Sequence, residues 1–165
     1  MDLPAPEPEA RAHSERLAEL IRAQVRAAGG AIPFSRFMEL ALYAPGLGYY
    51  SAGARKFGAG GDFVTAPELG PAFATAVAHA VAPVLQALGE GTAFFELGGG
   101  SGAFAAAVLP ALAAREALPS EYWLLEPSAD LRERQRERLQ SALPAALFAR
   151  CRWLDGPPQE SWRGV

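Results

Sequence analysis

Hydrophobic residues recur along this chain with two different spacings, and the change from one to the other falls near residue 92. Before that point apolar side chains return every three or four residues, which is typical of helices that bury one face. This spacing predicts helices over residues 14–28, 35–42 and 71–88. Ser14 and Ser35 are suitable N-cap residues for the first two, and Gly89 is a suitable stop for the third.

After residue 92 the pattern changes to short apolar runs separated by amphipathic stretches. The runs at residues 92–97, 122–125 and 150–154 predict strands, and residues 103–115 and 131–143 predict the helices between them. Strands that alternate with helices are typical of an α/β fold, in which a parallel sheet is built with right-handed crossovers.

The same pattern predicts how the chain is organised. We expect a flexible tail over residues 1–13 and an N-terminal helical region over residues 14–90. That region includes a long loop rich in glycine and aromatic residues between the second and third helices. Residues 91–165 would then form the first part of the sheet domain.

One predicted helix carries an unusually dense run of charge. Residues 132–138 contain four arginines and two glutamates around Gln135. Because acids and bases are mixed in this run, we predict a solvated helix face rather than an anion-binding patch.

Composition excludes several classes of protein. Half of the 165 residues are hydrophobic and one fifth are charged, which is a globular balance. A net charge of −3 does not suggest a nucleic-acid-binding protein. No apolar stretch approaches the roughly 20 residues of a membrane span, and the N-terminus lacks the features of a signal peptide. One cysteine and two histidines offer neither a disulfide nor a typical metal site. We therefore expect a cytoplasmic, bacterial protein.

The glycine-rich segment Gly98–Gly102, between a predicted strand and a predicted helix, carries the strongest functional signal. Glycines there let the backbone turn sharply and approach a ligand, and the helix that follows directs its free N–H groups toward it. Glu126 ends the next predicted strand, where a carboxylate can accept hydrogen bonds from both hydroxyls of a ribose. This pattern predicts a ligand that contains a nucleoside.

The glycines alone do not decide which nucleoside is bound. Gly98, Gly100 and Ala103 also satisfy the dinucleotide pattern G-x-G-x-x-G/A. Glu96, two residues before the first glycine, would repel a pyrophosphate, whereas it would favour the sulfonium and ammonium groups of S-adenosylmethionine. We therefore prefer a methyltransferase, with a nicotinamide-dependent oxidoreductase as the alternative.

Taken together, the segments resemble the MidA-like methyltransferases, bacterial relatives of the mitochondrial complex I assembly factor that methylates arginine. The resemblance extends from about Ile32 to Trp153. Its most specific parts are the segments Ile32–Tyr43, Gly46–Tyr50 and Gly61–Glu68. The segments Glu96–Gly102 and Leu125–Ser128 also lie where the family has them.

The resemblance implies a class I methyltransferase fold, which is a Rossmann-like parallel sheet with helices on both faces, preceded by an N-terminal helical region. It also implies S-adenosyl-L-methionine as cofactor. It implies that Glu126 binds the ribose and that Asp155 reads the adenine. The residues that it implies at the methionine end are Glu96, Gly98, Gly100 and Gly102, and we include Gly99 of the same run.

The resemblance also implies the substrate class, a protein arginine, and by extension a respiratory-complex subunit as partner. Asp62 and Glu68 are candidate catalytic residues that would orient a guanidinium group. Both also have a structural interpretation, since Asp62 could stabilise its glycine-rich turn and Glu68 the start of the next helix. The sequence makes no prediction of the oligomeric state.

The chain departs from the family pattern at its C-terminal end. It stops near the expected start of the fourth strand, which in class I methyltransferases pairs with the first. We therefore expect a truncated sheet with an exposed edge on the first strand. This departure keeps a second alternative open, a non-catalytic assembly or interaction protein that retains the fold.

Overall fold

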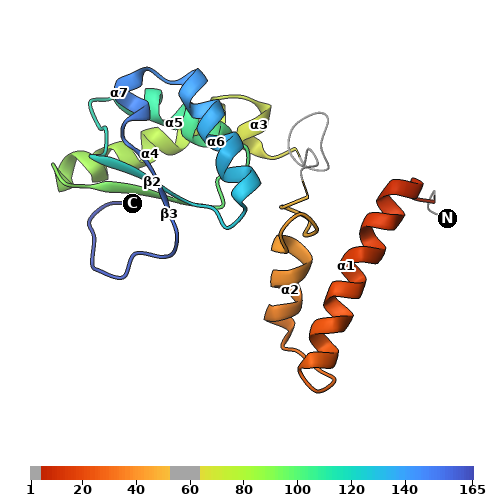
Figure 1. Ribbon diagram of the computed structural model, residues 1–165. Helices are drawn as coiled ribbons and strands as arrows, with labels where there is room; N and C mark the ends of the chain where they lie inside the picture. Colours follow the sequence, from red (N-terminus) through yellow and green to blue (C-terminus); the bar gives the residue numbers. More distant parts are fainter. Residues whose placement is uncertain (1–4, 53–63) are drawn as a thin grey trace. The chain divides into compact units, whose positions relative to one another are not determined.

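The helices and strands follow the order that the hydrophobic pattern predicts. A computed structural model describes residues 5–52 and 64–165 (Figure 1). The chain divides into two units, Met1–Ala54 and Arg55–Val165, which are considered separately below. No helix of the described residues has the length and apolar character that a membrane span requires.

The first unit contains the helices α1 (Pro8–Ala27) and α2 (Phe34–Tyr43). Helix α1 begins before the expected cap at Ser14, so residues 8–13 are helical rather than part of the tail. Proline is favoured in the first helical turn because that turn leaves its N–H groups unbonded in any case, and Glu9 complements the helix dipole. His13 Nε2 also lies 2.8 Å from the carbonyl oxygen of Leu47, which links α1 to the turn after α2.

That turn explains part of the Gly46–Tyr50 segment. The backbone folds back on α2, where Tyr49 N donates to Ala41 O at 2.9 Å and Tyr50 N donates to Leu42 O at 2.8 Å. A Cβ atom at Gly48 would lie only 2.5–2.6 Å from backbone atoms of residues 42–44, so this close approach requires glycine.

The second unit is built on a three-stranded parallel sheet in the order β1-β2-β3. The strands are β1 (Ala93–Leu97), β2 (Glu121–Leu125) and β3 (Cys151–Leu154). Helix α5 (Ala103–Ala113) connects the first two strands, and α6 (Ala129–Ala142) with the short α7 (Ala145–Phe148) connects the second and third. The predicted parallel α/β sheet is therefore confirmed, whereas α7 and the four-residue α3 (Ala66–Leu69) were not predicted.

The core of this unit is formed by the sheet with α4 (Ala72–Leu88), α5, α6 and α7. Alanines at every fourth position of α4 are buried and allow α5 to approach closely. Val108, Leu109 and Leu112 of α5 have no exposed surface, and burial of each such side chain contributes about 1.5–3 kcal/mol. Helix α4 thus belongs to the same compact unit as the sheet, although the pattern of hydrophobic spacing changes only after it.

The last residues of the chain lie along the free edge of β1. Ala93 N donates to Arg163 O at 2.8 Å, Phe95 N donates to Val165 O at 2.7 Å, and Gly164 forms a parallel bridge with Ala93. The edge of β1, which the sequence predicts to be exposed, is therefore partly paired. A Cβ atom at Gly164 would overlap the carbonyl oxygen of Ala93, so that only glycine permits this pairing.

We predict that Gly164→Ala releases this edge. The amide hydrogens of Ala93 and Phe95 lose their acceptors and should exchange at least about tenfold faster, whereas the amides of β2 keep their protection. Hydrogen exchange measured residue by residue by NMR tests this. Gly156→Ala is the matched control, because a Cβ at Gly156 meets no atom within 4 Å. Unchanged exchange at Phe95 in Gly164→Ala would contradict the assignment.

Candidate functional site

The predicted glycine loop follows β1 directly and requires its glycines for two different reasons. Gly98, Gly100 and Gly102 have φ angles of +67°, +53° and +79°, a left-handed conformation that favours glycine. Gly99 has an ordinary conformation, but its Cβ would lie 3.3 Å from Nε2 of Gln135. The loop is fixed at its two ends, since Gly98 N donates to Leu125 O and Gly102 N donates to Gly99 O.

A pocket of about 230 Å³ opens between the glycine loop and the segment that leads into α3. It brings together several residues that the sequence singled out, including Glu68, Glu96 and the first three glycines. Ligand pockets generally span about 300–1,000 Å³, so this one fits one end of a nucleoside-containing ligand rather than the whole. Its lining consists of Thr65, Pro67, Glu68, Glu96, Gly98, Gly99, Gly100, Ser101, Ala103 and Phe104.

Glu96 supplies a carboxyl group whose charge depends on what the pocket contains. The pKa of this carboxyl is raised to about 7, chiefly by burial and to a smaller extent by nearby Glu126, while the hydrogen bond that the Tyr122 hydroxyl donates to it at 2.8 Å acts in the opposite direction. A cation placed beside Glu96 would favour the ionised form. The pocket is therefore suited to a positively charged group.

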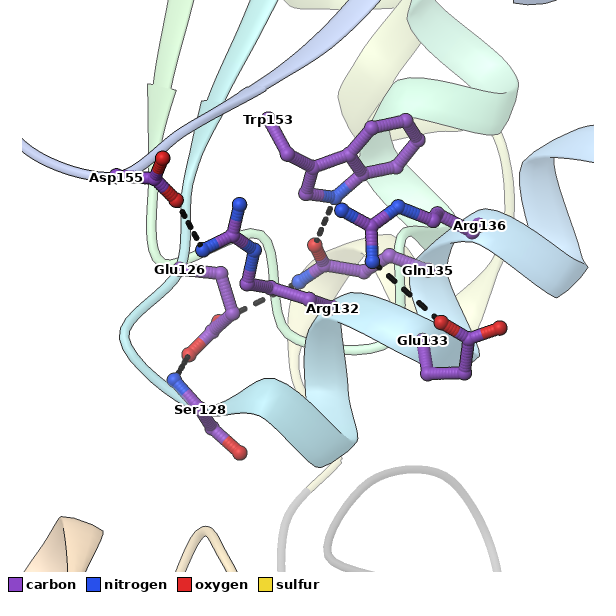
Figure 2. Close-up of polar contacts among 8 residues, drawn as sticks. All are labelled: Glu126, Ser128, Arg132, Glu133, Gln135, Arg136, Trp153 and Asp155. Carbon is purple, nitrogen blue, oxygen red and sulfur yellow. Dashed lines mark hydrogen bonds and ion pairs between the residues drawn. The ribbon is translucent and has the colours of Figure 1, made fainter.

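Glu126 lies at the end of β2 and is almost fully buried, with 4% of its surface exposed. Its two oxygens accept hydrogen bonds from Ser128 N at 3.0 Å and from Gln135 Nε2 at 3.3 Å (Figure 2). Burial is the main cause that raises its pKa. A carboxylate has roughly four acceptor positions, so Glu126 retains capacity for further donors such as hydroxyl groups.

Gln135 is a residue of the site that the sequence analysis overlooked. It lies within the charged run that predicts a solvated face, yet it has no exposed surface. Figure 2 shows its amide between Glu126 and Trp153. The spacing could have revealed this, because Leu131, Gln135 and Leu139 are four residues apart and share the buried face of α6.

Glu68 is engaged by polar neighbours in the pocket wall. The hydroxyl of Ser101 donates a short hydrogen bond to it, and Arg138 of α6 forms an ion pair with it at 3.5 Å and donates to Ser101 Oγ at 2.6 Å. These contacts tie α3 to the glycine loop. They give Glu68 a different role from the predicted stabilisation of the next helix's start, and the catalytic role of Glu68 stays a prediction.

Among the described residues that were predicted for the site, Gly102, Glu126 and Asp155 do not line this pocket. Asp155 follows β3 with its side chain 93% exposed and forms an ion pair with Arg132 at 2.8 Å (Figure 2). Asp62 lies outside the described residues. Within residues 5–52 and 64–165, no three acidic, histidine or cysteine side chains gather where they could hold a metal ion.

Comparisons with known proteins agree with this geometry. A family model described as "Putative S-adenosyl-L-methionine-dependent methyltransferase" matches residues 76–164. A crystal structure of a COG1565 superfamily protein from Burkholderia thailandensis, with methyl transfer as its suggested activity and S-adenosyl-homocysteine bound, is 51% identical to this chain with a TM-score of 0.83. A second structure of a COG1565 superfamily protein from the same organism is 49% identical with a TM-score of 0.78. No curated protein matches.

Both solved structures extend well beyond the part that resembles this chain. The similarity covers 97% of this chain but 42% and 40% of the two relatives. This likeness confirms the predicted Rossmann-like fold with its preceding helical region.

The raised pKa of Glu96 predicts how stability depends on pH. The folded chain keeps this proton while the unfolded chain loses it near its ordinary pKa of 4.5, so stability falls as the pH rises from there to about 7. Relative to Glu96→Gln, the wild type should lose about 3 kcal/mol of unfolding free energy over this range. Denaturant unfolding at several pH values measures this, with the exposed Glu160→Gln as control. Parallel profiles for wild type and Glu96→Gln would contradict the prediction.

Proposed function

This chain belongs to the family described as S-adenosyl-L-methionine-dependent methyltransferases, and from this premise we propose that it binds S-adenosyl-L-methionine at its glycine loop for methyl transfer. The fold is that of a class I methyltransferase. The single observation that carries the proposal is the half-buried carboxyl of Glu96 beside Gly98–Gly100 in one pocket.

The charge of this pocket supports a cationic ligand. S-adenosyl-L-methionine carries a sulfonium and an ammonium group, and either would stabilise the ionised form of Glu96. The hydroxyl of Tyr122 holds the Glu96 carboxyl in place at 2.8 Å, so that it needs little rearrangement on binding. A pyrophosphate at the same position would meet a like charge, which disfavours the nicotinamide alternative.

Glu126 is the residue that we propose for the ribose. It lies at the carboxyl end of the strand next to the glycine loop, where this fold binds nucleosides. Its buried carboxylate already accepts from Ser128 N and Gln135 Nε2, and these bonds fix its direction. Asp155 remains a proposal for the adenine.

The chemical work of the chain's own residues is mainly positioning. When bound, the cofactor supplies an electrophilic methyl group on a sulfonium, which transfers by in-line displacement to a nucleophile on the substrate. Glu96, Glu126 and the glycine loop would then orient the donor.

We propose a protein arginine as substrate, on the resemblance to the MidA-like methyltransferases. A respiratory-complex subunit is the partner that this resemblance suggests. We propose that Glu68 lies near the substrate group that accepts the methyl group, because Glu68 lines the pocket beside the glycine loop. That Asp62 orients the substrate stays a prediction from the sequence. The cytoplasmic location of the protein also stays a prediction from the sequence.

We predict that Glu126→Gln weakens the binding of S-adenosylhomocysteine by about 10- to 100-fold, because hydrogen bonds to a charged acceptor contribute about 1.5–3 kcal/mol. Isothermal titration calorimetry of this chain measures the affinity. Glu133→Gln, a neighbouring exposed glutamate, is the matched control and should bind like the wild type. NADH should give no saturable binding. Equal affinity of Glu126→Gln and wild type would contradict the ribose assignment, and tight NADH binding would favour the oxidoreductase.

The substrate class needs its own test. With methyl-labelled S-adenosyl-L-methionine, we expect label to appear on a protein acceptor and, after hydrolysis, in methylarginine. An acceptor whose arginines are replaced by lysine should remain unlabelled. Label recovered on another residue type would overturn the arginine proposal while leaving methyl transfer intact. Cofactor binding without any transfer would favour the non-catalytic alternative.

A further inference from the structure

Gln135 connects the three strands of the sheet at their carboxyl ends. Its side chain is fully buried on α6, between Leu131 and Leu139. Nε2 donates to Gly100 O at 3.0 Å and lies 3.3 Å from Glu126 Oε2, and Oε1 accepts from Trp153 Nε1 at 2.9 Å. One amide therefore contacts the glycine loop after β1, the acid after β2 and a tryptophan of β3. Figure 2 shows the contacts with Glu126 and Trp153.

The partners fix which way the amide points. An indole N–H can only donate, so the atom of Gln135 that faces Trp153 must be the oxygen. The NH₂ group then faces Gly100 O and Glu126 Oε2, both of which are acceptors. Because each partner has the complementary character, rotation of the amide by 180° would break all three contacts.

The glycine loop is also shaped around this side chain. A Cβ atom would lie 3.3 Å from Gln135 Nε2 if placed at Gly99 and 3.5 Å from Gln135 atoms if placed at Gly102. The first distance is tighter than an ordinary contact, so the lack of a Cβ at Gly99 lets the loop pack closely against α6, while Gly102 lies in ordinary contact range of Gln135. Gln135 acts on the loop by hydrogen bonding and by close packing.

We propose that Gln135 is a positioning residue that holds the Gly100 carbonyl and the Glu126 carboxylate at a fixed separation. The two ends of one bound cofactor, its methionine part at the loop and its ribose at Glu126, then meet groups that are already in place. This inference rests on the proposed function, and it assigns to Gln135 a role in affinity without direct contact with the cofactor.

Gln135→Met tests the inference, because methionine has a similar length but neither donates nor accepts these bonds. We expect the amides of Gly98 and Gly102 to exchange at least about tenfold faster, while amides of β1 and β2 at Phe95 and Leu124 keep their protection. The affinity for S-adenosylhomocysteine should fall by at least about tenfold. Gln140→Met makes the same change at an exposed position of α6 and should alter neither.

Gln135→Glu separates hydrogen bonding from packing, because it keeps the shape of the side chain. At pH 8 its carboxylate would face the Glu126 carboxylate and the Gly100 carbonyl and would be repelled by both. Two further charged groups lie close by, the acid Glu96 across the loop and the cation Arg132 beside Glu126. Burial of the introduced carboxyl beside Glu126 raises its pKa, so that at pH 6 it is more protonated than at pH 8 and the protonated form can donate one hydrogen bond. The loss of affinity relative to wild type should therefore shrink from at least about tenfold at pH 8 to within about threefold at pH 6.

Three results would overturn the inference: unchanged loop exchange in Gln135→Met, unchanged affinity in Gln135→Met, or a pH-independent loss in Gln135→Glu. A wild-type chain that fails to bind S-adenosylhomocysteine overturns the proposed function, and with it the role of Gln135 in cofactor affinity. The exchange data distinguish these cases, since they report on the loop whether or not the cofactor binds.

Discussion

The buried polar groups at the carboxyl ends of the strands impose the constraint on which the site depends. A polar group that is removed from water without a partner costs roughly 1–3 kcal/mol of stability in proteins, and more when it is charged. Glu96 meets this requirement through Tyr122, and Glu126 through Ser128 and Gln135. Since these partners come from β2, the following turn and α6, the site forms only when these elements are assembled.

This arrangement also determines the electrostatic character of the pocket. Burial raises the pKa of both Glu96 and Glu126, and Glu126 raises that of Glu96 further. Two acids held in this way make an anionic ligand unfavourable and a cationic one favourable. The same geometry from which we predict lower stability at neutral pH therefore favours a positively charged ligand.

The segment before the sheet takes part in the site through α3. Glu68 contacts Ser101 and Arg138, so the wall of the pocket is joined both to the glycine loop and to α6. Helix α6 thus supports the site twice, through Gln135 on the Gly100 carbonyl and through Arg138 on Ser101. Within the charged run of α6, Gln135 lies on the buried face of the helix, whereas Glu133 lies on the exposed face.

The sequence by itself determined the elements and the first acids of the site. Local spacing is enough to identify a strand, a glycine turn and a helix, and the carboxyl ends of parallel strands necessarily share one edge, which places Glu96 and Glu126 near the loop. Only the tertiary structure decided the role of Gln135, the contacts of Glu68 and the exposed position of Asp155. The physical reason is that the burial and contacts of these three residues depend on which segments, distant in the sequence, pack against them. A local sequence pattern contains no information about such packing.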